Sequence, residues 1–121
     1  MAYNTPTMWA FWGAQAEWSE ATFGTIAERG PIGPLKHLKK EVDETLAKPH
    51  DLEEYADMLF LLVDATRRAG FTYDQWVEKA FEKLEKNKKR TWAKPTASDE
   101  PVEHIREETP ECECGMPDCQ E

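Results

Sequence analysis

The spacing of acidic residues between positions 41 and 57 constrains this chain more than any other feature. Glu41 and Glu44 lie three residues apart, and Glu54 and Asp57 repeat the spacing after a short break. Residues three apart share one face of a helix, so each pair directs two carboxylates to one side. The two pairs lie symmetrically on either side of Pro49, with Glu44 matching Glu54 and Glu41 matching Asp57. Proline is excluded from the interior of a helix. Two antiparallel helices joined there would bring Glu44 level with Glu54, and Glu41 level with Asp57.

Four carboxylates that face one another repel unless cations lie between them, and ligands that offer only oxygen suit Mg²⁺ or Mn²⁺. The alternative is a solvated charged face, which is what most acidic runs are. Asp57 directly precedes the apolar segment 58–63, where an unpaired carboxylate is costly. The pattern therefore favours a metal site over a solvated face.

The remaining sequence predicts an all-α domain of four helices, a bundle with no strand-like alternation. Prolines, glycines and capping residues place the helices at about residues 6–23, 35–47, 52–69 and 72–90. The segment 58–63 is apolar on every side, which marks a helix buried by several neighbours or by another subunit. The core face expected for the second helix comprises Leu35, Leu38, Val42 and Leu46.

The charge of the chain is concentrated at one end. Of the formal net charge of −9, residues 99–121 carry −8, from nine acids and one base, which leaves −1 for residues 1–98. We therefore expect one domain over residues 1–92, followed by an acidic, largely disordered or loosely docked tail over residues 93–121. An acidic chain argues against nucleic-acid binding, and no apolar run is long enough to cross a membrane.

All three cysteines, Cys112, Cys114 and Cys119, lie in this tail. The body has none, so a reducing cytoplasm is the simplest setting, and the N-terminus shows no signal peptide. The cysteines could bind zinc with His104 as a fourth ligand, but their spacing matches no standard zinc module. An incidental tail or a weak metal site is the favoured interpretation.

Several ordered motifs give the chain a family resemblance. Glu41-x-x-Glu44 followed by Glu54-x-x-Asp57 resembles the metal-binding signature of the MazG-type all-α nucleoside triphosphate pyrophosphohydrolases. The resemblance is closer to their branch of phage and bacterial dATP/dGTP diphosphohydrolases, and it covers about residues 20–92. It also rests on Phe23-Gly24, Gly33-Pro34-Leu35-x-His37-Leu38-x-Lys40-Glu41, Leu52-Glu53-Glu54-Tyr55-Ala56-Asp57, Arg67-Arg68-Ala69-Gly70 and Lys83-x-x-x-Asn87-x-x-Arg90-x-Trp92.

The resemblance implies metal-dependent hydrolysis of a purine deoxynucleoside triphosphate between its α and β phosphates. The four acids would hold two or three Mg²⁺ or Mn²⁺ ions and carry the catalysis. The favoured substrate is dGTP, with dATP next, in phage nucleotide-pool control or synthesis of a modified base such as 2-aminoadenine. Family members are typically dimers or tetramers, so a homo-oligomer is expected. The alternatives are another substrate, such as a pyrimidine or damaged nucleotide, and a non-enzymatic helical interaction module.

Residues for substrate binding are also predicted. Lys83, Asn87 and Arg90 form one stripe of the fourth helix; alone they would be a solvated basic end, but the resemblance favours contacts with phosphates or sugar. Lys40 and His37 precede the first acid, and His37 could orient a ligand carboxylate or face solvent. We expect the tryptophans of the first helix to lie in the core or in a subunit interface before any other role. Trp12 or Trp18 could also supply one wall for the base.

Overall fold

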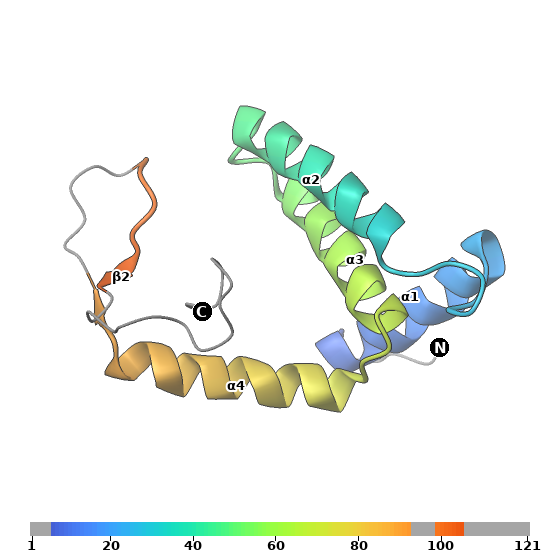
Figure 1. Cartoon of the computed structure of the whole chain (residues 1–121). Coiled ribbons are helices and arrows are strands. Elements are labelled where there is room, and N and C mark those ends of the chain that lie inside the picture. Colours follow the sequence, from blue (N-terminus) through green and yellow to red (C-terminus); the bar gives the residue numbers. More distant parts are fainter. Residues whose placement is uncertain (1–5, 93–98, 106–121) are drawn as a thin grey trace. The chain divides into compact units, whose positions relative to one another are not determined.

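The computed structural model describes residues 6–92 and 99–105, and four helices make up most of this part of the chain (Figure 1). The helices are α1 (Met8–Phe23), α2 (Ile32–Ala47), α3 (Leu52–Arg68) and α4 (Tyr73–Lys89). The all-α class predicted from the sequence is confirmed. None of the described helices is long and apolar enough to span a membrane. The chain divides into two compact units between Ala80 and Phe81, within α4.

The first two helices begin at different residues from those predicted. Thr7 is the N-cap of α1, and its hydroxyl accepts a hydrogen bond from the Ala10 amide at 3.0 Å, so the helix starts after Pro6. α2 starts at Ile32 and contains Pro34, although the sequence predicted a loop to this point. A proline in the first helical turn removes only an amide that has no helical partner there.

The remaining caps agree with the sequence. The Asp51 carboxylate accepts a hydrogen bond from the Glu53 amide at 3.0 Å and starts α3. Gly70 follows that helix with a φ of 100°, a conformation that a glycine adopts without strain. Before α4, Thr72 and Gln75 exchange side-chain-to-backbone hydrogen bonds of 2.9 and 3.1 Å, which completes the capping box.

The helices α2 and α3 form an antiparallel hairpin and lie side by side (Figure 1). The amide of Lys48 still bonds to the carbonyl of Glu44 at 3.1 Å, and the chain then turns at Pro49. Tyr55, one turn into α3, donates its hydroxyl to the Pro49 carbonyl at 2.8 Å. This bond ties the turn to the helix that follows, and the hairpin is the one expected from the symmetry of the acidic residues.

Aromatic contacts hold α1 against α3 and against the start of α4. Phe60 of α3 meets Phe11 and Trp18 of α1, with ring centroids 6.3 and 5.5 Å apart. Trp12 packs on Tyr73 and on Trp76 at the start of α4, at 5.7 and 5.6 Å. Such edge and tilted arrangements contribute beyond the area they bury.

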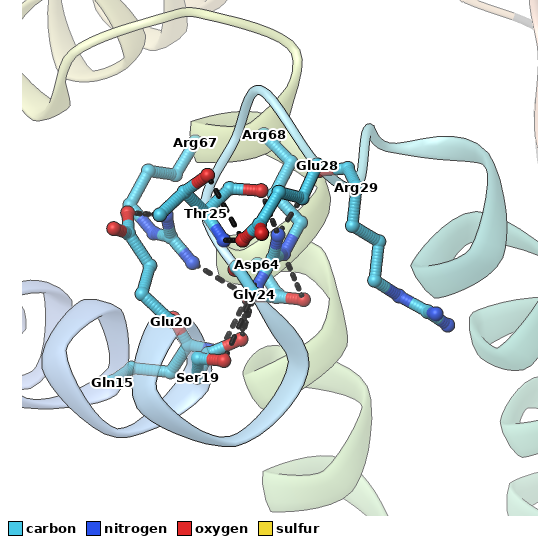
Figure 2. A network of polar contacts seen from close by, with 10 residues as sticks. All are labelled: Gln15, Ser19, Glu20, Gly24, Thr25, Glu28, Arg29, Asp64, Arg67 and Arg68. Atoms are coloured by element: carbon cyan, nitrogen blue, oxygen red, sulfur yellow. Dashed lines mark hydrogen bonds and ion pairs between the residues drawn. The ribbon is translucent and has the colours of Figure 1, made fainter.

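A buried polar network also joins α1 to α3 (Figure 2). Asp64 lies at its centre and accepts hydrogen bonds from Gln15 and Ser19 of α1, at 3.0 and 2.7 Å. It also accepts from Arg67 at 2.8 Å and from Arg68 Nε at 3.0 Å. In the sequence, Arg67 and Arg68 were part of a family motif near the end of the third helix. Both are buried in the structure, because Asp64 lies three and four residues before them and pairs with both.

The predicted core face of α2 is wrong in most of its positions. Leu35, Val42 and Leu46 are exposed in the single chain, by 45, 41 and 73%. Leu38 is half-buried, and the buried residues of α2 include Glu41. The helix therefore turns its acidic face toward α3 and leaves a leucine- and valine-rich face uncovered.

In the second unit, the tail returns to the end of α4. Strand β1 (Thr91–Trp92) pairs antiparallel with β2 (His104–Ile105), with Thr91 opposite Ile105 and Trp92 opposite His104. The Trp92 and His104 rings are 5.5 Å apart, and Trp92 donates its indole N–H to the Asn87 carbonyl at 2.8 Å. This pairing was not predicted. The boundary at residue 92 between body and tail stays a prediction.

Candidate active site

An acidic cluster lies between the two helices of the hairpin. One carboxylate oxygen from each of Glu41, Glu44 and Glu54 lies within 4.8 Å of the other two. Glu41 and Glu44 come from α2 and Glu54 from α3, so the cluster depends on the turn at Pro49. The structure thus brings together three of the four acids that the sequence spacing selected.

Both buried members of the cluster have raised pKa values. Burial is the largest cause for Glu41 and for Glu54, and the negative charges of Glu44 and Asp57 add to it. For Glu54 the nearby Lys48 opposes this shift. Within the described residues, Oε1 of Glu41 and Oε1 of Glu54 are buried without a hydrogen-bond partner. Buried carboxylate oxygens that lack donors fit a site that receives cations.

Asp57 lies beside this group and is not one of its members. It lines a pocket together with Glu41, and its charge raises the pKa of both Glu41 and Glu54. The expectation that apolar neighbours hold Asp57 in a buried position is wrong, because the side chain is exposed. The apolar residues that follow it in α3 turn to other faces of the helix.

The pocket next to the cluster has a volume of about 490 Å³, a size typical of small-ligand sites. Acidic residues line part of it, and aromatic side chains from α1 and α3 line another part. Its aromatic residues are Trp18, Phe23 and Phe60. Arg29, Gly33, Pro34 and His37 also contribute to the lining. The pocket therefore combines flat apolar surfaces with carboxylates that belong to, or adjoin, the cluster.

Arg29 is a pocket residue that the sequence analysis missed. It lies in the Gly/Pro-rich segment before α2, which was read only as a loop. Its guanidinium lies over the Phe23 ring, 5.9 Å from the centroid. The signal that could have identified it was a lone arginine three residues before Ile32, the first residue of the helix that carries Glu41 and Glu44.

The predicted residues around Glu41 take different positions. His37 lines the pocket, and its Nε2 lies 3.6 Å from Glu41 Oε2, while 60% of its side chain is exposed to solvent. Its role in orienting Glu41 stays a prediction. Lys40 is exposed on α2. Trp12 is buried among the α4 aromatics and does not line this pocket, whereas Trp18 does. The pocket therefore favours Trp18 as the tryptophan that would meet a base.

The predicted stripe of α4 lies in the second unit. Asn87 accepts a hydrogen bond from Arg90 at 3.0 Å, and Lys83 is half-buried and also has an interaction partner. These two findings describe the stripe itself, and its role in binding phosphates or sugar stays a prediction. Of the four tail residues considered as zinc ligands, only His104 is described; Cys112, Cys114 and Cys119 lie outside the described residues.

The described part of the chain is thus an all-α protein with a carboxylate cluster shared by two helices. A family model described as dATP/dGTP pyrophosphohydrolase matches residues 12–118, and the chain belongs to this family. The family is one of nucleoside triphosphate pyrophosphohydrolases, as the sequence predicted. The match extends well beyond Trp92, where the resemblance recognised in the sequence ends.

The chain is also similar to the Eaa protein of Salmonella phage P22, with 48% identity over 94 residues. This alignment covers 77% of the chain but 28% of the phage protein, so the chain spans less than a third of that relative's length. No solved structure matches the chain.

Proposed function

We propose that this protein hydrolyses a purine deoxynucleoside triphosphate to the monophosphate and pyrophosphate, in a reaction that depends on Mg²⁺ or Mn²⁺. Family membership supports the substrate class. The observation that carries the proposal is the approach of Glu41, Glu44 and Glu54 to within 4.8 Å, from two helices. Three carboxylates this close would repel one another without a cation.

The acids are suited to hold two or three divalent ions. Glu41 and Glu54 each have a buried oxygen without a donor, and the third member of the cluster, Glu44, is exposed. Asp57, which lines the pocket together with Glu41, would complete the set as the fourth ligand. When bound, such ions offset the charge of the triphosphate and make a water acidic enough to act as a nucleophile at neutral pH. One of the four carboxylates would accept the proton of the attacking water.

The other predicted residues have supporting roles in this proposal. His37 orients Glu41 across 3.6 Å. The aromatic side chains of the pocket, with Trp18 in place of Trp12, contact the base. Lys40, together with Lys83, Asn87 and Arg90, supplies charge and hydrogen bonds for the phosphates or the sugar. Of the two purines in the family description we place dGTP first.

We also propose that the protein works as a homo-oligomer. The buried apolar core of the described residues is small and consists of Trp12, Leu61, Val63 and Ala65. Large apolar side chains are exposed along both helices of the hairpin. They include Ile32, Leu35, Val42 and Leu46 of α2, and Leu52, Tyr55 and Leu62 of α3. A second copy would cover this surface. Changing Leu46 to Glu should lower the mass measured by light scattering.

The biological setting follows from the relative and is part of the proposal. The similarity to a protein of a Salmonella phage supports a phage-encoded enzyme that acts in the host cytoplasm. There it would control the nucleotide pool, by removing dATP or by supplying dGMP for synthesis of a modified base such as 2-aminoadenine.

Pyrophosphate release from a panel of nucleoside triphosphates, with and without Mg²⁺, tests the proposal. We expect release from dGTP and dATP only with the metal ion, and a loss of at least about 100-fold in Glu54→Gln. Glu53→Gln is the matched control, because Glu53 is the exposed neighbour of Glu54 and lies outside the cluster. It should retain wild-type activity.

The same panel separates the alternatives. Release from a pyrimidine or damaged nucleotide, at a higher kcat/KM than from either purine, would keep the chemistry and replace the substrate. Absence of metal-dependent release from every nucleotide would contradict the proposed activity and leave the interaction module as the better interpretation.

A further inference from the structure

We propose that Arg29 determines base specificity in the pocket beside the acid cluster, and that it selects guanine over adenine. The inference rests on the proposed function and sharpens it, because it names the group that would read the base. It starts from the position of the Arg29 side chain, which the metal chemistry does not require.

Arg29 belongs to the aromatic part of the pocket. Its guanidinium lies 5.9 Å from the centroid of the Phe23 ring, and Phe23 contacts Trp18 at 5.4 Å. The guanidinium also lies against Gly33 in the first turn of α2, where an added Cβ would be 2.9 Å from Nη2. Gly33 precedes Glu41 by eight residues, which is roughly 12 Å along a helix. Arg29 is therefore separated from the cluster by a distance that a nucleoside could span.

The donors of Arg29 are available to a ligand. Within residues 6–92 and 99–105, its guanidinium has no hydrogen-bond or ion-pair partner, and its contact is with an aromatic face. Of the other polar side chains of the pocket, Asp64 accepts from four residues and His37 lies near Glu41. Glu41 and Asp57 are carboxylates, which accept and do not donate hydrogen bonds when ionised. A base in this pocket would therefore meet Arg29 as a polar side chain with unused hydrogen-bonding capacity.

The backbone of Arg29 is held in place by the buried network. Arg68 donates from Nη1 to the Arg29 carbonyl at 3.0 Å and to the Thr25 carbonyl at 3.3 Å. Glu28, the preceding residue, accepts from the Thr25 amide at 2.8 Å. Figure 2 shows the Arg29 side chain directed away from these contacts. Its main chain is thus fixed while its guanidinium faces the pocket, which is the arrangement that a recognition residue needs.

The chemistry of the guanidinium decides which purine it favours. Arginine offers five donors and no acceptor. Guanine presents two acceptors, O6 and N7, on one edge, and an arginine can donate to both. Adenine presents N7 and a donor amino group on the same edge, so one of the two bonds is lost and two donors face each other. Arg29 should therefore favour purines with an oxo group at position 6 over purines with an amino group at that position.

A role with the phosphates is the competing possibility for a pocket arginine. The surroundings of Arg29 favour the base, because Phe23, Trp18 and Phe60 form flat apolar surfaces suited to stacking. The phosphates are expected at the acids, where the cations would be held.

The test measures binding as well as turnover, on the full-length protein. Dissociation constants are determined by calorimetry for the α,β-methylene analogues of dGTP, dITP and dATP in the presence of Mg²⁺. We expect the dGTP and dITP analogues to bind about 5- to 150-fold more tightly than the dATP analogue, the discrimination of one bidentate contact. dITP has O6 and N7 but lacks the 2-amino group, so it isolates the edge that Arg29 would read.

Arg29→Gln should reverse or abolish this preference, since glutamine pairs with the N6 and N7 edge of adenine. Gly33→Ala should reduce it by a smaller factor, because the new methyl group displaces the guanidinium without removing its charge. Lys36→Gln is the control for loss of one positive charge on an exposed site of α2, and it should retain the preference. Circular dichroism verifies that each variant is folded.

Three results would overturn the inference: equal affinity of the wild type for the three analogues, dITP that behaves as dATP, or equal weakening of all analogues in Arg29→Gln. The last would assign Arg29 to the phosphates. Because affinity is measured with analogues that are not hydrolysed, the inference can fail while the nucleotide panel still confirms the activity, and it can hold if turnover is absent.

Discussion

Helix α3 carries two buried carboxylates ten residues apart that have opposite surroundings. Glu54 and Asp64 are exposed by 8 and 5%, so they are buried to a similar degree. Asp64 accepts hydrogen bonds from four side chains, two of them arginines, whereas Glu54 faces Glu41 and Glu44 and has a buried oxygen without a donor. The same type of group is satisfied within the chain at one end of the helix and lacks partners at the other.

The pKa values of the two carboxylates express this difference. Burial tends to raise the pKa of Asp64, but hydrogen bonds from Gln15 and Ser19 and the charge of Arg68 outweigh it, and the pKa is lowered. Burial raises the pKa of Glu54 too, and neighbouring acids add to the effect. The comparison separates a carboxylate whose hydrogen-bond partners lie within the chain from one that has a buried oxygen without a partner among the described residues.

The largest expected effect is at Asp64. Asp64→Asn leaves the buried Arg68 without its charge partner and leaves Arg67 with Glu20 alone. Breaking a buried pair of this kind destabilises a protein by about 3–5 kcal/mol. The free energy of unfolding, measured with urea, tests this. Ser19→Ala, which removes one donor to Asp64, should cost about 1–3 kcal/mol and serves if the first variant does not fold. Stability that is unchanged in both variants would remove the distinction between the two carboxylates.

Metal binding should stabilise the protein through the other site. At a concentration of Mg²⁺ or Mn²⁺ 100 times its dissociation constant, the gain is about 2.7 kcal/mol, because the ion binds the folded state. Thermal unfolding with the ion and with a chelator measures it. The shift should disappear in Glu54→Gln and persist in Glu53→Gln. An equal shift in both variants would place the ion elsewhere.

Without metal, removing a charge from the cluster should stabilise the protein. Glu54→Gln abolishes a buried charge that other acids repel, so its melting temperature at pH 7 in chelator should rise, by a few degrees at most. Measured in the same assay, Glu54→Gln should stabilise the protein and Asp64→Asn should destabilise it. This difference in sign is the most direct test of the comparison between the two carboxylates. A lower melting temperature for Glu54→Gln would mean that the cluster stabilises the fold.

The smallest and most gradual effect is the dependence of stability on pH in the absence of metal. The raised pKa values of Glu41 and Glu54 mean that the folded state favours their protonated forms. Their contribution is therefore lost as the pH rises from the ordinary value of 4.5 through the raised values. Asp64 acts in the opposite sense, and its contribution is lost as the pH falls below 3.8 through its lowered pKa.

Urea unfolding from pH 3 to pH 8 in chelator records both slopes. Glu41→Gln combined with Glu54→Gln should flatten the decline above pH 4.5 and leave the acid side unchanged. A decline that is the same in the double variant would have to come from groups outside the cluster.

The local elements of this fold could be read from the sequence because their signals are local. The cap at Asp51, the glycine at position 70 and the capping box at Thr72 act through bonds between residues a few positions apart. The hairpin followed from Pro49 and from acids placed symmetrically about it. The helix register then fixed which acids meet, and Glu41, Glu44 and Glu54 do meet.

What the sequence did not reveal depends on which faces are covered. The apolar stripe of α2 implied burial, but the acidic face packs toward α3 and Leu46 is exposed. A hydrophobic pattern states that a face needs a partner and does not identify the partner. Asp57 was expected to be buried for a related reason, since its apolar sequence neighbours point elsewhere on the helix.

By itself, then, the sequence determined the helical class, the hairpin and the acids that meet in it, together with the family. Only the tertiary structure decided the use of Asp64, Arg67 and Arg68, because their partners on α1 are more than 40 residues away along the chain. It also decided the place of Arg29, a loop residue in sequence that becomes a pocket residue when α1, α2 and α3 come together. Spacing along one helix can be counted from the sequence, whereas contacts between helices depend on how those helices pack.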